Sequence, residues 1–211
     1  MTQVGERPFA SAKLCGLILA GGQARRFGRD KRLATLGDQR LIDLCVARFA
    51  PQVHRLVISA NDQIPGLEAV THLRDQEACQ GPLLGIGAGL SFAAGEGFDW
   101  LITVPADSPF LPHDLARSLL QHDGEARIRF ASSSGQRHPI FGAWPTHLAA
   151  SLWAHIAAGE RKIDRVAEAL GGYSDVFWPL QAQLGDPFFN INRREDLAAA
   201  QRLYRASSAS S

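Results

Sequence analysis

The segment LCGLILAGG, from Leu14 to Gly22, decides the fold, because an unbroken apolar run ends in two consecutive glycines. Leu14 to Ala20 is apolar throughout, which is typical of a strand buried on both faces of a parallel sheet. Gly21 and Gly22 then let the backbone turn and approach a ligand closely. We therefore predict a buried first strand followed by a ligand-binding loop that extends to Lys31.

Strands and helices alternate outward from this segment. Further strands are predicted at residues 56–59, 69–73 and 100–104, and helices at 41–49, 81–94 and 112–121, the last with Pro112 in its first turn. The second half is more mixed, with strands predicted at 140–144 and 176–178, helices at 146–157 and 162–170, and a short extended piece at 188–191. The pattern predicts an α/β fold: a Rossmann-like three-layer αβα arrangement of βαβ units around a mainly parallel sheet, with an antiparallel part in the C-terminal half.

The two ends of the chain lack such patterns. Residues 1–12 are expected to be a flexible N-terminus, and 205–211, serine-rich, a disordered tail. No repeat or linker divides the middle, which predicts a single domain over 13–204. Near its end, Asn192 resembles a helix N-cap, with Glu195 three residues later in the capping-box position.

Composition excludes several classes of protein. The net charge is +1, from 22 basic and 21 acidic residues, whereas a protein that binds DNA or RNA usually has a basic excess. The three cysteines are far apart in the sequence, which matches neither a zinc site nor a disulfide framework. The first dozen residues contain no apolar core long enough to suggest a signal peptide, and no run approaches the roughly 20 apolar residues of a membrane span. We expect a soluble, cytoplasmic protein with no nucleic-acid or membrane partner.

The loop after the first strand is basic. Residues 21–32 read GGQARRFGRDKR, and five of the last eight are Arg or Lys. Gly21 and Gly22 can expose backbone N–H groups, and Arg26 and Lys31 can contact phosphate oxygens, as a polyphosphate requires. A basic turn facing solvent is the alternative. The spacing matches neither a Walker A loop nor the dinucleotide-binding Gly-x-Gly-x-x-Gly, which argues against ordinary ATPases and dehydrogenases.

Polar residues follow the other predicted parallel strands. Asp107 comes just after residues 100–104, where a carboxylate can hold magnesium against substrate phosphates. It could instead be a turn or cap residue before Pro109. Asn61 follows the predicted strand at 56–59, and Asp75 follows the one at 69–73. Both could recognise the edges of a base, or could each form an Asx turn.

A second glycine-rich segment, GPLLGIGAG, covers residues 81–89. Gly81 and Gly85 suggest another close approach of backbone to ligand. Alternatively, the later glycines only let a helix pack tightly.

The chain resembles the molybdenum cofactor guanylyltransferases over residues 13–204. The resemblance begins with LILAGGQARRFGRDK (17–31) and continues, in the family's order, through VISAN (57–61), RDQEACQGPLLGI (74–86), VPADSPFLPHDL (104–115), RHPIF (137–141), AAGERK (157–162) and FFNINRREDL (188–197). The first segment and the aspartate segment are shared by many nucleotidyltransferases. The last three narrow the resemblance to this family.

The resemblance implies an enzyme that transfers GMP from GTP to molybdenum-molybdopterin, uses Mg²⁺ and releases pyrophosphate. The N-terminal half would hold GTP and magnesium and the C-terminal half the pterin. The residues it implies for the nucleotide are Leu19, Ala20, Gly21, Gly22, Lys31, Asn61, Asp75, Gly81, Gly85 and Asp107. Arg26, Lys31 and Asp107 would be catalytic, with Asp107 on the metal. The residues it implies for the pterin are His138, Arg161, Asn190 and Asn192, although a histidine before proline can also simply end a strand.

Two positions depart from the family pattern. Phe27-Gly28-Arg29-Asp30 stands where relatives often have methionine and one more glycine, and Lys162 stands where a second arginine is common. A lysine at position 162 could not bind a phosphate with two parallel hydrogen bonds, as an arginine can, if the reaction needed such a contact.

Other functions stay open at this point. The nearest is molybdopterin cytidylyltransferase, although Leu19-Ala20-Gly21-Gly22 favours guanine, since the cytidylyl enzymes tend to have Leu-Ala-Ala-Gly. A sugar-phosphate nucleotidyltransferase and a non-catalytic GTP-binding module are further alternatives. Protein partners would be molybdoenzyme apoproteins, their chaperones or other cofactor-biosynthesis proteins.

Overall fold

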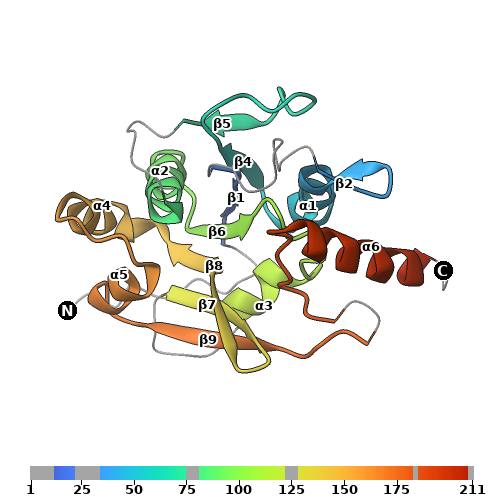
Figure 1. Ribbon diagram of the computed structural model, residues 1–211. Helices are drawn as coiled ribbons and strands as arrows, with labels where there is room; N and C mark the ends of the chain where they lie inside the picture. Colours follow the sequence, from blue (N-terminus) through green and yellow to red (C-terminus); the bar gives the residue numbers. More distant parts are fainter. Residues whose placement is uncertain (1–11, 22–33, 75–80, 122–127, 183–184, 209–211) are drawn as a thin grey trace.

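The structure, a computed structural model, describes residues 12–21, 34–74, 81–121, 128–182 and 185–208 (Figure 1). In chain order its elements are β1 (Leu14–Leu19), β2 (Thr35–Leu36), β3 (Gln39–Arg40), α1 (Leu41–Phe49), the 3₁₀ helix η3 (Ala50–Gln52), β4 (Arg55–Ser59), β5 (Thr71–Leu73), α2 (Pro82–Gly95), β6 (Trp100–Pro105), α3 (Leu115–Gln121), β7 (Ile128–Ser133), β8 (Gln136–Pro145), the 3₁₀ helix η4 (Thr146–Leu148), α4 (Ala149–Ala157), α5 (Ile163–Ala169), β9 (Tyr173–Trp178) and α6 (Arg194–Ser208).

One seven-stranded sheet runs through both halves of the described chain, in the order β5-β4-β1-β6-β8-β7-β9. Strands β5, β4, β1 and β6 are parallel, and β8 is antiparallel to both of its neighbours, β6 and β7. The predicted mainly parallel sheet with an antiparallel part in the second half is therefore confirmed.

Alternating side chains divide the core between the two faces of the sheet. Ile18 and Val104 face α1 and α3, whereas Leu17 and Leu101 face α2, α4 and α5. Figure 1 shows these two groups of helices on opposite sides of the sheet. The predicted three layers follow directly from this period of two along each buried strand. Within the described residues, no helix is long and apolar enough to cross a membrane.

Helix α6 packs outside the α1 layer. A small apolar cluster joins it to the β2–β3 hairpin and to the segment after β6, with members Leu36, Leu41, Phe110, Ile191 and Ala200. This cluster fixes the segment before α6 against the loop that follows β6, which matters for the site below.

Several sequence predictions need correction. Helix α3 begins at Leu115, so Pro112 is not in its first turn, and the Leu115 N–H is 3.4 Å from the Pro112 carbonyl oxygen in the preceding turn. Residues 188–191 form no strand. Sequence reasoning also missed β7 and the β2–β3 hairpin. β7 is short and polar at its end, ASSSG, which hides the apolar period.

Candidate active site

The candidate site lies at the edge of the sheet where the parallel strands end. Leu19 at the end of β1 pairs with Ser59 of β4 and with Pro105 of β6, and Ser59 pairs with Leu73 of β5. The four strands therefore stop in one row. In an open α/β sheet, this row is where ligands bind.

Backbone hydrogen bonds tie the segments after these strands together. The Ala20 N–H donates to the Ser59 carbonyl at 2.9 Å, and the Ala106 N–H donates to the Leu19 carbonyl at 3.1 Å. Ala20 and Gly21 thus start the first loop between exposed Asn61 on one side and half-buried Asp107 on the other. Gly22, Arg26, Lys31 and Asp75 lie outside the described residues.

Helix α2 packs closely against the start of the first loop. A Cβ atom at Gly85 would lie 2.5 Å from Leu19 Cδ2 and 2.8 Å from Ser59 Oγ, so this glycine lets the helix approach β1 and β4. Gly81 precedes α2 with φ of 150° and open space around it, a conformation that favours glycine. Gly85 thus has a packing role, and its predicted contact with the nucleotide stays a prediction.

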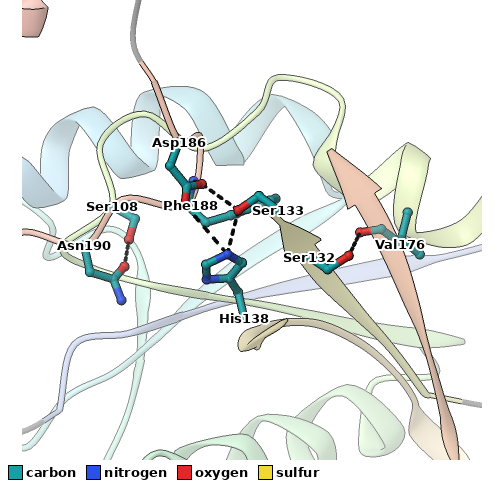
Figure 2. Close-up of polar contacts among 8 residues, drawn as sticks. All are labelled: Ser108, Ser132, Ser133, His138, Val176, Asp186, Phe188 and Asn190. Atoms are coloured by element: carbon teal, nitrogen blue, oxygen red, sulfur yellow. Dashed lines mark hydrogen bonds and ion pairs between the residues drawn. The ribbon is translucent and has the colours of Figure 1, made fainter. Parts of the chain in front are cut away.

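Asp107 is followed by a turn that binds the C-terminal half of the chain. The Ile191 N–H donates to the Asp107 carbonyl at 3.0 Å, and the Ser108 hydroxyl donates to Asn190 Oδ1 (Figure 2). Ser108 is fully buried. Asp107 and Asn190, predicted for opposite substrates, are therefore brought together.

The metal prediction for Asp107 is chemically consistent with this position. Among the described residues there is no group of three or more His, Cys, Asp or Glu that could hold a metal alone. Magnesium commonly takes one or two carboxylates and completes its shell with substrate phosphates and water. A single half-buried carboxylate beside the first loop fits that pattern.

His138 lies at the same edge, on β8. Gly142 pairs with Thr103, and the Thr103 hydroxyl donates to the Ile140 carbonyl at 2.6 Å, so the residues before Ile140 pass the end of β6. The His138 ring packs 4.9 Å from the Phe188 ring, and its side chain is 11% exposed. Burial lowers the pKa of His138 below its usual value, and the nearby Asp186 carboxylate opposes this effect.

Figure 2 shows His138 within a polar cluster. Its Nε2 is 2.8 Å from Ser133 Oγ and 3.9 Å from Asp186 Oδ2, and Ser133 donates to Asp186 Oδ1 at 2.9 Å. Sequence reasoning missed Ser133, Ser108 and Asp186. Asp186 directly precedes the Pro-Phe-Phe-Asn-Ile-Asn segment, which was a usable signal, whereas the serines carried none.

The other two predicted pterin residues make local contacts. The Arg161 guanidinium donates to the carbonyls of Ile156 and Glu160, at 2.7 and 2.8 Å, in the exposed loop after α4. The N–H groups of Asn192 and Arg193 both donate to Asp196 Oδ2 at 2.8 Å. The predicted Asn192–Glu195 capping box is therefore not formed: α6 begins at Arg194, Asp196 accepts from the backbone before the helix, and the Arg193 side chain has no acceptor to complete the pair. Among the contacts of the described residues, none joins Arg161 to His138 or to Asn190.

Comparisons with known proteins agree with this architecture. A family model, described as MobA-like NTP transferase domain, matches residues 16–175. A molybdenum cofactor guanylyltransferase from Cereibacter sphaeroides is 42% identical over 201 residues, covering 92% of this chain and 98% of the relative. Another of that name, from Mesorhizobium japonicum, is 39% identical over 202 residues, covering 92% and 97%.

Solved structures show the same fold. Molybdopterin-guanine dinucleotide biosynthesis protein A from Archaeoglobus fulgidus matches with a TM-score of 0.71 at 22% identity, covering 90% of this chain and 98% of that one. A 4-diphosphocytidyl-2C-methyl-D-erythritol synthase from Anaerococcus prevotii matches with a TM-score of 0.72 at 11% identity, covering 92% and 96%. At such identities the likeness concerns the fold alone.

Proposed function

Because the chain belongs to the MobA-like NTP transferase domain family, we propose that it transfers GMP from GTP to molybdenum-molybdopterin and releases pyrophosphate. The observation that carries this proposal is the 42% identity, over 92% of the chain, to a protein named molybdenum cofactor guanylyltransferase. The junction of Asp107 with Asn190 and Ile191 supports it, because a transfer between two substrates needs both binding sides at one place.

The reaction is a displacement at the α-phosphorus of GTP. An oxygen of the terminal phosphate of molybdopterin forms the new P–O bond, and the bond to the β-phosphate oxygen breaks, so pyrophosphate leaves with that electron pair. The attacking phosphate is already ionised at neutral pH, and therefore no general base is required. Arg26, Lys31 and the amides of Gly21 and Gly22 would stabilise the departing pyrophosphate.

Asp107 would hold magnesium in this reaction. When bound, the ion would supply positive charge against the α-phosphate oxygens. The β6 strand and the Ile191 N–H fix the Asp107 backbone on both sides. Asn61 and Asp75 would lie around guanine or ribose, with Gly81 bordering the site, while Arg161 and Asn192 would face the pterin from the loops that carry them.

The first experiment measures pyrophosphate release from GTP, CTP, ATP and UTP, with magnesium and molybdenum-loaded molybdopterin present. Release from GTP alone, lost when the pterin is omitted, is expected. Release from CTP instead would move the assignment to molybdopterin cytidylyltransferase, and GTP binding without release from any nucleotide would favour a binding module.

Asp107→Ala should lower kcat by about a hundredfold or more, because the charge that orients the α-phosphate is lost. The matched control is Asp114→Ala, which removes an exposed carboxylate that only accepts from the Ser118 hydroxyl at 3.0 Å. We expect full activity from this control. A folded Asp107→Ala protein with wild-type turnover would refute the metal role.

A cytoplasmic location is part of the proposal. Cys15 and Cys45 are buried free thiols, which suits a reducing compartment. Molybdoenzyme apoproteins, their chaperones or other cofactor-biosynthesis proteins would receive the product.

A further inference from the structure

The polar cluster around His138 is built on a fully buried serine. Ser133, the last residue of β7, lies within hydrogen-bond distance of both His138 Nε2 and Asp186 Oδ1. Asp186 Oδ1 also accepts from the Phe188 N–H at 2.9 Å, which holds the segment before Asn190 in place. Figure 2 shows Ser133 and Asp186 together on one side of the imidazole ring.

Counting protons in this cluster assigns the tautomer of His138. The Ser133 hydroxyl has one proton, and an ionised Asp186 can only accept, so the hydroxyl donates to Asp186. Ser133 Oγ must then accept from His138, which requires the proton on Nε2. In the neutral ring, Nδ1 is left as a hydrogen-bond acceptor. Burial of the ring against Phe188 favours the neutral form.

A second buried serine orients Asn190 in the same way. The Ser108 hydroxyl donates to Asn190 Oδ1, so both protons of the Nδ2 amide group remain for another partner. Figure 2 shows that this nitrogen points away from Ser108, and that the second ring nitrogen of His138 lies on the side of the ring toward Asn190. The Phe188 ring packs against His138, and only Phe189 separates Phe188 from Asn190 in the chain. These connections keep His138 and Asn190 on one surface, which we call the wall.

We infer that Ser133 and Ser108 are positioning residues that give this wall a fixed polarity, with His138 Nδ1 as acceptor and Asn190 Nδ2 as donor. Such a pair is complementary to the edge of a cyclic amide, where a ring N–H donor lies beside a C=O acceptor. The oxo-pyrimidine ring of a pterin has that edge, and guanine has one too. This inference rests on the proposed function, because the two proposed substrates, molybdopterin and GTP, contain these two rings. Of the two, the inference assigns the wall to the pterin.

The tautomer is tested first, without any substrate. Nitrogen-15 NMR of histidine-labelled protein should show His138 protonated at Nε2 and unprotonated at Nδ1, with the signals assigned by their loss in His138→Gln. Ser133→Ala should release this preference and mix the two tautomers. Asp186→Asn should preserve it, because Oδ1 still accepts from Ser133 and from the Phe188 N–H. A wild-type ring protonated at Nδ1 would overturn the inference.

Ser132→Ala is the matched control. Ser132 is the adjacent serine of β7, but its hydroxyl donates to the Val176 carbonyl of β9 at 3.2 Å, away from His138. We expect this variant to keep the wild-type tautomer and wild-type kinetics. A change of tautomer equal to that in Ser133→Ala would mean that general loosening of β7 explains the effect, which would overturn the role of Ser133.

Steady-state kinetics then test which ring the wall recognises. Asn190→Asp, which keeps Oδ1 but removes the donor, should raise KM for molybdenum-molybdopterin about three- to tenfold, with KM for GTP unchanged. Ser133→Ala should raise KM for molybdenum-molybdopterin about twofold, because an equal mixture of tautomers halves the competent fraction of the protein. An increase in KM for GTP alone would assign the wall to guanine and overturn the pterin part. If the variants are active and both KM values are unchanged, the inference is overturned but the proposed function stands. If the wild-type protein releases no pyrophosphate, the proposed function is refuted, and the NMR measurement alone then tests the tautomer of His138.

Discussion

At the scale of single residues, His138 shows how burial and one hydrogen bond together set the behaviour of a side chain. The side chain is 11% exposed and packs against Phe188, and Asp186 is the charged group that faces it among the described residues. Because desolvation outweighs that carboxylate, the folded-state pKa of His138 lies below its unfolded value. Ionisation of His138 therefore makes the free energy of unfolding depend on pH.

The sign of this contribution gives a prediction. Below the unfolded pKa of about 6.5, the unfolded chain binds the His138 proton more readily than the folded protein, so the free energy of unfolding falls as pH decreases toward the folded pKa. Above that range the contribution is constant. Urea unfolding at pH 7.5 and 5.5 should show a larger loss of stability for wild type than for His138→Gln. Equal losses in the two proteins would contradict the lowered pKa.

The sequence could indicate the chemistry of the site only where a residue type is unusual for its place. Asp107 just after a buried strand, and Asn190 in the Asn-Ile-Asn motif, are of that kind, and the structure joins them through Ile191. Ser133 and Ser108 were missed because serine is common in turns and at strand ends, and their importance depends on burial, which no local pattern records. The first loop from Gly22 to Lys31 stays a prediction, since it lies outside the described residues.

At the scale of secondary-structure elements, the contact of α2 with β1 and β4 depends on small residues. Gly85, Gly87 and Gly89 are all buried on helix α2. Added Cβ atoms would lie 2.5 Å from Leu19 Cδ2 at Gly85 and 2.6 Å from Leu17 Cδ2 at Gly89. A larger residue at either position would therefore displace these leucine side chains, or the helix itself, from their present packing.

Gly85→Ala should accordingly destabilise the protein by about 1–3 kcal/mol, as overpacking of a close-packed core does. It should also raise KM for GTP, because the methyl group would displace Leu19 at the start of the first loop. Gly95→Ala is the matched control in the same helix, where a Cβ meets nothing within 4 Å. There, loss of glycine flexibility should leave stability unchanged or raise it by up to about 1 kcal/mol. Denaturant unfolding and GTP titrations measure both effects, and similar behaviour of the two variants would exclude the packing explanation.

Elements were predictable where one signal governed the whole segment. The buried runs of β1 and β6 and the helical spacing of α1 were read correctly to within one residue of each end. Sequence reasoning missed β7 because three of its six residues, Arg129, Ser132 and Ser133, are polar. The strand nevertheless lies inside the sheet, between β8 and β9. Tertiary pairing decides such a strand, whereas residues 188–191, predicted as a short extended piece, belong to no strand of the described chain.

At the scale of the whole molecule, the two halves of the described chain, to which we assign the nucleotide and the pterin, share one sheet and one set of contacts at its edge. We propose that residues 13–204 unfold as a single unit, because β6 of the first half pairs directly with β8 of the second. Ile191 strengthens this coupling, since its side chain is fully buried with Leu36 and Leu41 while its N–H donates to the Asp107 carbonyl.

This proposal predicts one cooperative transition. Trp144, Trp153 and Trp178 lie in the second half, and replacing Trp100, at the start of β6, by phenylalanine leaves fluorescence that reports on that half alone, whereas hydrogen exchange at β1 and β4 reports on the first. Both probes should give the same urea midpoint. Ile191→Ala should lower the free energy of unfolding by about 2–5 kcal/mol and move both midpoints together, because the cavity loosens α6, the β2–β3 hairpin and the Asp107 turn at once. Separate midpoints, or an Ile191→Ala shift seen by the fluorescence probe alone, would show that the two halves fold independently and that the site is assembled between two domains.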